Sequence, residues 1–366
     1  MSERGWQVAV VGGGPAGAAA AVGLARLGVR AVVLEAGPVP RRKVGECLPP
    51  SANPLLSRVG LSGSLGRGCH LRSHGNRSVW GGPHPVDRDF LFGPHGPGWH
   101  LDREAFEASL HEAARGAGAE WRYGRRVVRC DRPGGVWNLA IETPAGREEL
   151  PAHFLIDASG RGARVARMCG ATRVRYDRLV GVVAILSGGE DSASGSHTLV
   201  EAVPSGWWYT ARQPGGELSA AFMTDADLLN GAGALGGWLL KLSEAGHTAR
   251  RAGGRLPAAP PRVVPAETSR LTDFCGEGWL AVGDAAAAYD PLSSYGITAA
   301  LGAGLHAAEA VAAALAGRPG ALAEYAGLLE RAFAAYLAAR RSHYASERRW
   351  AEPFWQRRHG ESRSGP

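Results

Sequence analysis

The sequence predicts an α/β protein in which a parallel sheet is interrupted by an inserted antiparallel sheet and followed by long C-terminal helices. Three observations support this fold class. The chain opens with a strand, a glycine-rich turn, a helix and a second strand, all within residues 7–35. Two later apolar strands, at 154–157 and 278–282, each end in an acidic turn. Apolar segments separated by turn residues occupy 180–224 and are typical of an antiparallel sheet with one solvated face.

The first 35 residues have the layout of a βαβ dinucleotide-binding unit. Residues 7–11 form an apolar, β-branched run, an alanine-rich helix is expected over 15–27, and a strand over 30–34 ends in Glu35. The turn between the first strand and the helix matches G-x-G-x-x-G. This unit therefore predicts a Rossmann-like domain that binds a dinucleotide.

Each glycine of the turn has a physical role in such a unit. Gly12 permits the tight turn, Gly14 lets a pyrophosphate approach the backbone, and Gly17 lets the helix pack closely on the strand. Free N–H groups at the helix start favour the diphosphate, and the Glu35 carboxylate can accept hydrogen bonds from ribose hydroxyls. The predicted contacts of the unit are Gly12, Gly14, Pro15, Ala16, Gly17, Glu35 and Ala36.

Two later segments indicate which dinucleotide is bound. Residues 154–164, FLIDASGRGAR, are a strand ending in Asp157 and a glycine-containing turn. Residues 278–286, GWLAVGDAA, end in a Gly-Asp pair and lead to an alanine-rich helix. With the N-terminal fingerprint, these motifs resemble the FAD-dependent aromatic hydroxylase superfamily, which includes the flavin halogenases. The resemblance implies a Rossmann-like FAD-binding domain of aromatic hydroxylase type with an inserted antiparallel-sheet substrate domain.

The resemblance also implies roles for individual residues. Asp284 stands at the position that binds the ribityl chain, although a simple helix-capping role is the alternative. Gly296 and Ile297, at a helix start, are expected at the N1/C2=O edge of the flavin, where a helix N-terminus stabilises negative charge. Further implied FAD contacts are Lys43, Gly45, Arg103, Val128, Asp157, Gly160, Gly283 and Pro291.

The order of segments predicts a discontinuous FAD domain with an inserted substrate domain. Helices are expected over about 103–116, 297–317 and 320–345, and the Gly- and Pro-rich residues 253–265 read as a return linker. The predicted domains are 1–80, 103–175 and 266–318 for FAD, 81–102 and 176–265 for the substrate, and 319–366 for a C-terminal helix with a basic and aromatic tail.

The loop at 41–50, RRKVGECLPP, narrows the resemblance to one branch of the superfamily. It is similar to the K-x-G-E-S-L-P-P loop of tryptophan-halogenase-like flavoproteins and of the maturation flavoproteins of quinone-cofactor oxidases. Five segments resemble the maturation side, whose members oxygenate a tryptophan side chain within a target protein: 206–209, 222–228, 291–294, 347–350 and 354–355. The chain departs from the pattern at Cys47, where Ser is usual, and at Tyr295, where Gln is common.

Two loop residues are candidate catalytic groups. Glu46 is the candidate acid, base or gating residue beside the flavin, or else a loop carboxylate that pairs with Arg41 or Arg42. Cys47 is either a flavin-linking thiol or a small replacement for Ser. The predicted substrate-facing aromatic residues are Trp207, Trp208 and Tyr209, with strand alternation sending Trp208 to the opposite face.

Lysine content separates two possible reactions. A flavin halogenase needs a lysine that relays hypohalous acid, and it carries a W-x-W-x-I-P segment. This chain lacks that segment and has two lysines, Lys43 in the flavin loop and Lys241 in a helical stretch of the inserted domain. The sequence therefore predicts a monooxygenase that hydroxylates an electron-rich aromatic of indole or tryptophan type through a flavin C4a-hydroperoxide. A halogenase, a non-oxygenating FAD dehydrogenase or reductase, and a catalytically idle flavin-binding chaperone are the alternatives.

Composition restricts the remaining possibilities. The net charge is +7, but the arginines are scattered, so a nucleic-acid partner is not expected. Five widely spaced cysteines show no metal-ligand spacing, and no apolar run reaches membrane-spanning length. We expect a reduced, soluble, cytoplasmic enzyme that uses O₂, with electrons from NAD(P)H or from reduced flavin supplied by a partner reductase. The aromatic substrate could be a small molecule or be borne by a target or carrier protein.

Overall fold

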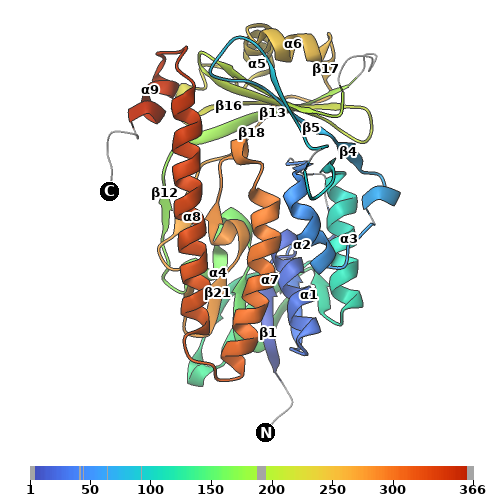
Figure 1. Ribbon diagram of the computed structural model, residues 1–366. Helices are drawn as coiled ribbons and strands as arrows, with labels where there is room; N and C mark the ends of the chain where they lie inside the picture. The colour runs from blue at the N-terminus through green and yellow to red at the C-terminus, as the bar shows by residue number, and fades with distance from the viewer. Residues whose placement is uncertain are drawn as a thin grey trace.

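The computed structural model describes residues 5–40, 43, 45–63, 65–91, 93–187 and 195–360. Two eight-stranded sheets dominate it, one at each end of the molecule in Figure 1, and a long C-terminal helix runs along both. The predicted pairing of Glu46 with Arg41 or Arg42 lies outside the described residues.

The first sheet has a parallel centre, as the sequence predicts. Strands β11, β1, β2 and β8 follow one another in parallel register, and β21 extends the sheet in parallel beside β11. Strands β9 and β10 form an antiparallel extension on β11. The bounds are β1 (Trp6–Val11), β2 (Ala31–Glu35), β8 (Glu120–Tyr123), β9 (Arg126–Asp131), β10 (Trp137–Thr143), β11 (Gly146–Asp157), β20 (Cys275–Gly276) and β21 (Trp279–Ala281).

Helices α1 (Pro15–Arg26), α3 (Arg103–Gly116) and α7 (Gly296–Leu315) lie beside this sheet. Helices α1 and α7 approach unusually closely, since a Cβ on Gly304 would lie 2.3 Å from the Ala16 carbonyl oxygen. Small residues on both helices therefore permit this contact. Helix α7 is the one described helix long and apolar enough to cross a membrane, and half of that apolar stretch is buried inside the protein.

The second sheet has the order β17-β13-β16-β15-β14-β5-β6, and β18 also pairs with β13. It is antiparallel except where β14 runs parallel to β5. Helices α5 (Leu235–Ser243) and α6 (Gly246–Ala252) cover one of its faces (Figure 1). The strands are β5 (Gly75–Val79), β6 (Val86–Asp89), β13 (Leu179–Ser187), β14 (Thr198–Val203), β15 (Gly206–Arg212), β16 (Leu218–Asp225), β17 (Leu256–Pro257) and β18 (Arg262–Pro265).

The expectation of a solvated face on this sheet is wrong at its centre. All eight residues of β16 are buried, on both faces. Trp208 and Phe222 pack against Trp238 of α5 on one face. The division into domains remains a prediction. Strand β5 pairs with β14 of the second sheet. Strand β18, which lies in the expected linker at 253–265, pairs with β13 of the same sheet.

Shorter elements connect the two sheets. Two three-stranded sheets lie between them, with the orders β3-β7-β4 and β12-β19-β22. Their strands are β3 (Cys47–Leu48), β4 (Leu71–Ser73), β7 (Gly98–His100), β12 (Arg173–Arg175), β19 (Ser269–Leu271) and β22 (Ala287–Ala288), and the short helices are α2 (Asn53–Arg58) and α4 (Arg164–Met168).

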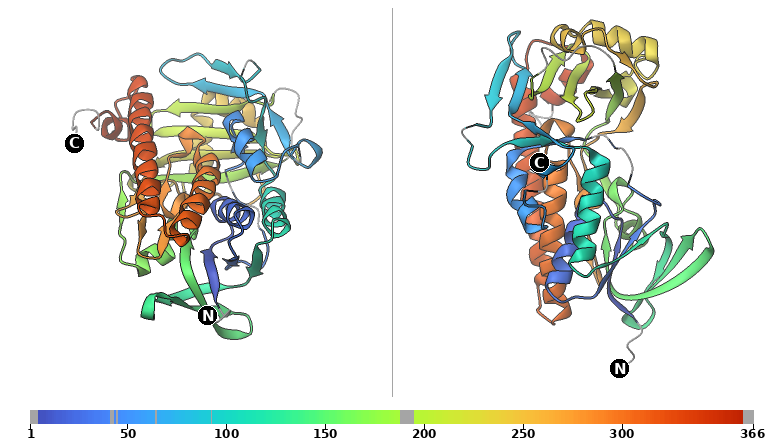
Figure 2. Two further views of the ribbon diagram at one scale, coloured as in Figure 1. Left: turned by 60° about the horizontal axis from the view of Figure 1, so that its bottom comes forward. Right: turned by 90° about the vertical axis from the view of Figure 1, so that its right-hand side faces the viewer.

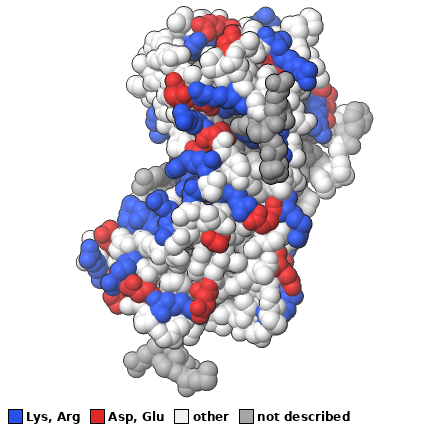
Figure 3. Space-filling view, turned by 90° about the vertical axis from the view of Figure 1, so that its left-hand side faces the viewer, with Lys and Arg blue, Asp and Glu red and all other residues white. Residues whose placement is uncertain are grey.

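The C-terminal segment packs along both sheets. Helix α8 (Ala321–Ser346) runs from beside α7 to the second sheet, and α9 (Pro353–Gly360) turns back at its end (Figures 1 and 2). Phe354 and Trp355 of α9 are fully buried, and the Trp355 indole N–H donates to the Val203 carbonyl at 3.0 Å. Acidic and basic groups are interspersed on the face shown in Figure 3.

Candidate functional site

A cavity of about 500 Å³ lies between the first sheet and the inserted sheet. Three chain turns that follow strands of the first sheet border it, at Gly14, at Gly160 and at Asp284. The inserted sheet closes the other side with Val183, Ala221 and other residues. The carboxyl end of a parallel sheet is where ligands bind in this architecture.

The turn before α1 has the shape that a dinucleotide requires. Gly12 has φ +109°, and a Cβ there would lie 2.3 Å from the Ala158 carbonyl oxygen. A Cβ on Gly17 would lie 2.0 Å from the Gly12 carbonyl oxygen. Gly14, by contrast, has open space where its Cβ would be and lines the cavity with Pro15. The backbone is therefore packed on one side of the turn and accessible on the side that faces the cavity.

The start of α7 provides a second helix N-terminus at the same cavity. Gly296 and Ile297 line the cavity, and open space surrounds the Cβ position of Gly296. Neither α1 nor α7 has a side chain that caps its first turn. Free N–H groups and the helix dipoles favour negative charge at both places. A diphosphate at α1 and an anionic flavin edge at α7 fit this arrangement.

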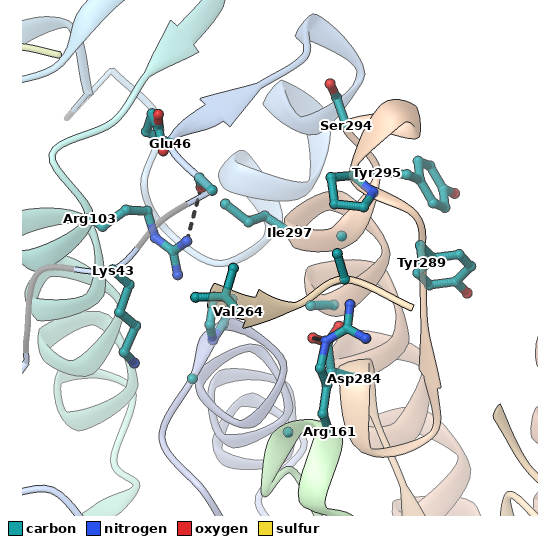
Figure 4. Close-up of a pocket in the computed structure, with 18 of the residues that line it drawn as sticks. Lys43, Glu46, Arg103, Arg161, Val264, Asp284, Tyr289, Ser294, Tyr295 and Ile297 are labelled. Carbon is teal, nitrogen blue, oxygen red and sulfur yellow. Dashed lines mark hydrogen bonds and ion pairs between the residues drawn. The ribbon is translucent and has the colours of Figure 1, made fainter. Parts of the chain in front are cut away.

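Asp284 and Arg161 stand together on one side of the cavity, away from Glu46 (Figure 4). The Arg161 Nε lies 3.6 Å from the Asp284 carboxylate. Desolvation raises the pKa of Asp284, and the charges of Arg161 and Arg173 oppose the increase. Asp284 lines the cavity, and its contact with a ribityl chain stays a prediction.

Asp157 shapes the neighbouring turn from behind instead of lining the cavity. Its carboxylate is fully buried and accepts hydrogen bonds from the N–H groups of Ser159 (2.9 Å) and Ala166 (2.8 Å). Burial raises the pKa of Asp157, and these hydrogen bonds oppose the increase. The bonds hold the turn that presents Gly160 and Arg161 to the cavity.

Six more predicted FAD contacts do not line the cavity, and two of them are Gly12 and Gly17, which are packed inside the turn before α1. Glu35 uses its two carboxylate oxygens to accept from the N–H groups of Gly13 and Gly37, each at 2.7 Å. Gly283 packs against α1, since a Cβ there would lie 2.7 Å from Ala16 Cβ. The other two are Ala36 and Val128. The predicted contacts that do line the cavity are Gly14, Pro15, Ala16, Lys43, Gly45, Arg103, Gly160, Asp284, Pro291, Gly296 and Ile297.

Glu107 is a cavity residue that sequence reasoning missed. Its buried carboxylate binds both Lys43 Nζ and an Arg103 Nη, each at 2.7 Å. Arg103 also donates to the Gly45 carbonyl at 2.9 Å, and this bond links α3 to the loop that carries Gly45. The sequence signal that could have identified Glu107 is its spacing from Arg103, because residues four apart on a predicted helix can form an ion pair.

The inserted sheet supplies an apolar wall, but only one of the three predicted aromatic residues lies in it. Tyr209 lines the cavity, together with Val183, Ala221, Met223 and Val264 among others. Trp207 and Trp208 do not line it, and both are fully buried. The burial of both tryptophans contradicts the prediction that they face the substrate, because neighbouring helices cover both faces of this part of the sheet. The Trp207 indole N–H donates to the Tyr344 hydroxyl at 3.0 Å. Trp208 packs on the opposite face of the sheet, in the hydrophobic core that includes Trp238 of α5.

Glu46, Cys47 and Tyr209 line the cavity close to one another, and the buried His100 pairs with Cys47 on the neighbouring strand. Glu46 is 2% exposed, and its Oε1 has no hydrogen-bond partner among the described residues. Burial, followed by the charge of Glu46, raises the pKa of Cys47 to about 12. Burial lowers the pKa of His100 to about 4 and raises that of Tyr209. Cys47, His100 and Tyr209 are therefore uncharged near neutral pH.

The loop before α7 is held by a buried ionic network. Asp290 accepts from the N–H of Leu292 (2.9 Å) and from the hydroxyl of Tyr344 (2.8 Å), and Arg340 Nε lies 3.4 Å away. Arg340 also bonds Asp177 at 2.9 Å. Side chains of α8 therefore determine where the loop that carries Pro291 meets the cavity.

Comparisons with known proteins agree with this architecture. The chain matches the tryptophan halogenase family over residues 7–71 and 83–364. It is 30% identical over 360 residues to the FAD-dependent oxidoreductase LodB of Marinomonas mediterranea, covering 96% of both chains.

Solved structures show the same fold. The myxobacterial chondrochloren halogenase CndH superposes with a TM-score of 0.89 at 23% identity, over 98% of this chain and 88% of its own. The peptidyl tryptophan dihydroxylase QhpG superposes with a TM-score of 0.79 at 27% identity, over 97% and 78%.

The fold and cavity define a Rossmann-type FAD-binding protein with an inserted substrate sheet. Within that class, the chain belongs to the tryptophan halogenase family of FAD-dependent enzymes.

Proposed function

We propose that this protein is an FAD-dependent monooxygenase that hydroxylates an electron-rich aromatic substrate of indole or tryptophan type. Support comes from the cradle at Gly14, from the relationship to LodB, and from the shared fold with QhpG, whose name describes dihydroxylation of a peptidyl tryptophan. QhpG also favours a protein-borne substrate, which we propose over a free small molecule.

The positions of the two lysines are the observation that favours hydroxylation over halogenation. Among the described residues that line the cavity, Lys43 is the single lysine, and Glu107 binds its ammonium at 2.7 Å. Lys241 lies on α5, outside the cavity, and pairs with Glu244. A relay of hypohalous acid needs a lysine amine available between flavin and substrate, and an arginine cannot replace it.

The chain's own residues would bind the cofactor, orient it and exclude water. FAD would supply the reaction of reduced flavin with O₂. The turn at Gly14 and the side chains of Arg103 and Arg161 would hold its phosphates and ribityl chain, and the start of α7 would stabilise negative charge on the ring. The apolar wall around Ala221 would keep water from the ring and from the substrate. Glu46 would hold or accept a proton at Oε1, the atom that has no hydrogen-bond partner in the described part of the chain.

The electron source and the role of Cys47 remain proposals. We propose NAD(P)H that docks transiently, or reduced flavin from a partner reductase, as donor. The raised pKa of Cys47 favours a protonated thiol in place of Ser over a flavin-linking thiolate.

Halogenation is the second candidate, because the family and several relatives carry that name. Relatives named as halogenases include the tryptophan 2-halogenase of Chondromyces crocatus, 26% identical over 336 residues. A non-oxygenating reductase is a third, distinguished by the absence of any modified aromatic product.

One experiment separates these reactions. Protein loaded with FAD is reduced and mixed with isotopically labelled O₂, potassium bromide and a tryptophan-containing peptide. A hydroxylase inserts labelled oxygen into the indole, and bromination would overturn the proposal. Peroxide without any modified peptide would favour a non-oxygenating flavoprotein.

A catalytic role of Glu46 has a separate test. Glu46→Gln should release more peroxide per product formed, and Glu112→Gln, an exposed change on α3, should not. Full product formation with tight coupling in Glu46→Gln would reject the role.

A further inference from the structure

An edge strand of the inserted sheet borders the cavity. Strand β18 pairs with β13 on one side, and no strand in the described part of the chain pairs with its other side. Arg262, Val263 and Pro265 of this strand are exposed, and Val264 is half-buried. An unpaired strand edge leaves backbone N–H and C=O groups available to another chain. A second extended chain can therefore add to the sheet beside β18.

The register of β18 on β13 shows which backbone groups face outward. The N–H of Ala266, directly after β18, donates to the Leu179 carbonyl of β13 at 3.0 Å. Successive residues of an antiparallel strand turn their backbone groups to opposite sides, so Val264 faces β13 and Val263 faces outward. Pro265 also faces outward, but proline has no N–H and offers only its carbonyl. Val263 is therefore the residue of β18 that presents both groups at the free edge.

The side chains of β18 alternate between the cavity and the opposite face of the sheet. Val264 lines the cavity together with Ala221 and Met223 of β16 (Figure 4). Val263 lies on the other face, where its Cγ2 is 3.6 Å from the position that a Cβ on Gly233 would take. Residues directly opposite each other on paired strands place their side chains on the same face. A residue paired with Val264 would therefore direct its side chain toward the cavity.

We propose that an extended segment of a protein substrate pairs antiparallel with β18 and places its tryptophan opposite Val264. This assignment rests on the protein-borne substrate proposed above. Val263 would exchange two backbone hydrogen bonds with the residue that follows the tryptophan, because an antiparallel pair satisfies both groups with one residue. The Pro265 carbonyl would accept from the residue that precedes the tryptophan. The strand edge thus binds the backbone of the segment, and the cavity receives its aromatic side chain.

Charge favours an acidic residue in the same segment. Arg262 is exposed and lies two residues before Val264, so the two side chains share a face of the sheet. In antiparallel register, the residue opposite Arg262 is the second one after the tryptophan. A carboxylate there would form a cross-strand ion pair with Arg262. The probe is therefore a blocked peptide with the sequence Ala-Val-Trp-Val-Asp.

The test measures binding of this peptide to the FAD-loaded full chain by calorimetry, so it does not depend on turnover. We expect methylation of the amide nitrogen of the valine after the tryptophan to weaken binding about 10-fold, because that N–H donates to the Val263 carbonyl. Methylation of the tryptophan amide nitrogen is the matched control, since that N–H faces away from β18, and it should leave the dissociation constant unchanged. Equal weakening by both methyl groups would overturn the proposal.

Variants test the same contact from the protein side. Val263→Pro removes the outward N–H and leaves the bonds between β18 and β13, so peptide binding should fall about 10-fold while FAD is retained. Val263→Thr keeps the N–H and should bind the peptide like wild type. Equal binding by both variants, or no binding by wild type, would overturn the proposal. A peptide that binds in this way but is not hydroxylated would refute the proposed function and support the strand pairing.

Hydrogen exchange on wild type decides the matter if Val263→Pro does not fold. In the free protein, the Val263 N–H should exchange rapidly and the Val264 N–H slowly, because β13 binds only the latter. Addition of the peptide should slow exchange at Val263. Unchanged exchange at Val263 would overturn the proposal. So would protection of Val263 that rises with protein concentration in the absence of peptide, since it would indicate a second copy of this chain on the edge.

Discussion

Gly17 shows how a single missing side chain permits the dinucleotide turn. Because a Cβ would lie 2.0 Å from the Gly12 carbonyl oxygen, Gly17→Ala must displace α1 from β1. We expect a loss of about 1–3 kcal/mol of unfolding free energy and weaker retention of FAD. Thermal unfolding and the ratio of flavin to protein absorbance measure both. Gly116→Ala on α3, where a Cβ meets nothing within 4 Å, is the control and should change neither.

Cys47 gives a pH-dependent prediction at the same scale. Its pKa of about 12 leaves far less thiolate at pH 8 than an ordinary cysteine has, by a factor on the order of 10³. Iodoacetamide should therefore label Cys47 in the folded protein much more slowly than the exposed Cys69, and the rate should keep rising with pH above 9. Peptide mass spectrometry over time measures this. Rapid labelling of Cys47 at pH 7 would contradict it.

At the scale of elements, Arg340 connects α8 to two buried carboxylates. Its guanidinium contacts Asp177 and Asp290, whose side chains are 6% and 1% exposed. Arg340→Leu leaves both carboxylates without this charge, and we expect a loss of about 3–5 kcal/mol of unfolding free energy at pH 8. Arg341→Leu, an exposed neighbour, is the control.

The pH dependence of this loss has a definite sign. Burial already raises the pKa of Asp290 in the folded protein, and removing Arg340 raises it further. The folded variant therefore takes up protons at a pH where the unfolded chain remains ionised, so its deficit should shrink from pH 8 to pH 5. Denaturant unfolding at both pH values measures this. A deficit that grew on acidification would refute the assignment.

Elements with local signals could be predicted, and those that depend on distant partners could not. The helix at 15–27 was expected because glycines flank an apolar alanine-rich run, and α1 covers 15–26. Strand β5 pairs with β14, more than 100 residues away, so no nearby pattern indicates its sheet. Alternation correctly separated Trp207 from Trp208, but it could not show which helices cover each face. The residues of the cavity that the sequence indicated best are those in glycine turns.

At the scale of the whole molecule, the C-terminal tail completes the core of the inserted sheet. Trp355 is fully buried against Phe354, Tyr344 and Trp80, which supports packing over partner docking for these aromatic residues. Trp355→Ala should cost about 3–5 kcal/mol of unfolding free energy, and Leu240→Ala, an exposed change on α5, much less. Urea unfolding measures both. Equal effects would contradict the tail's structural role.

Helix α8 has a consequence for how reactants enter and leave. Its 26 residues reach about 39 Å and are fastened to both sheets through Tyr325, Arg340 and Tyr344. A helix of this length that is attached to both sheets opposes rotation of one sheet against the other. We therefore expect access to the cavity to depend on local movements of the loops around it and not on rotation of one sheet against the other.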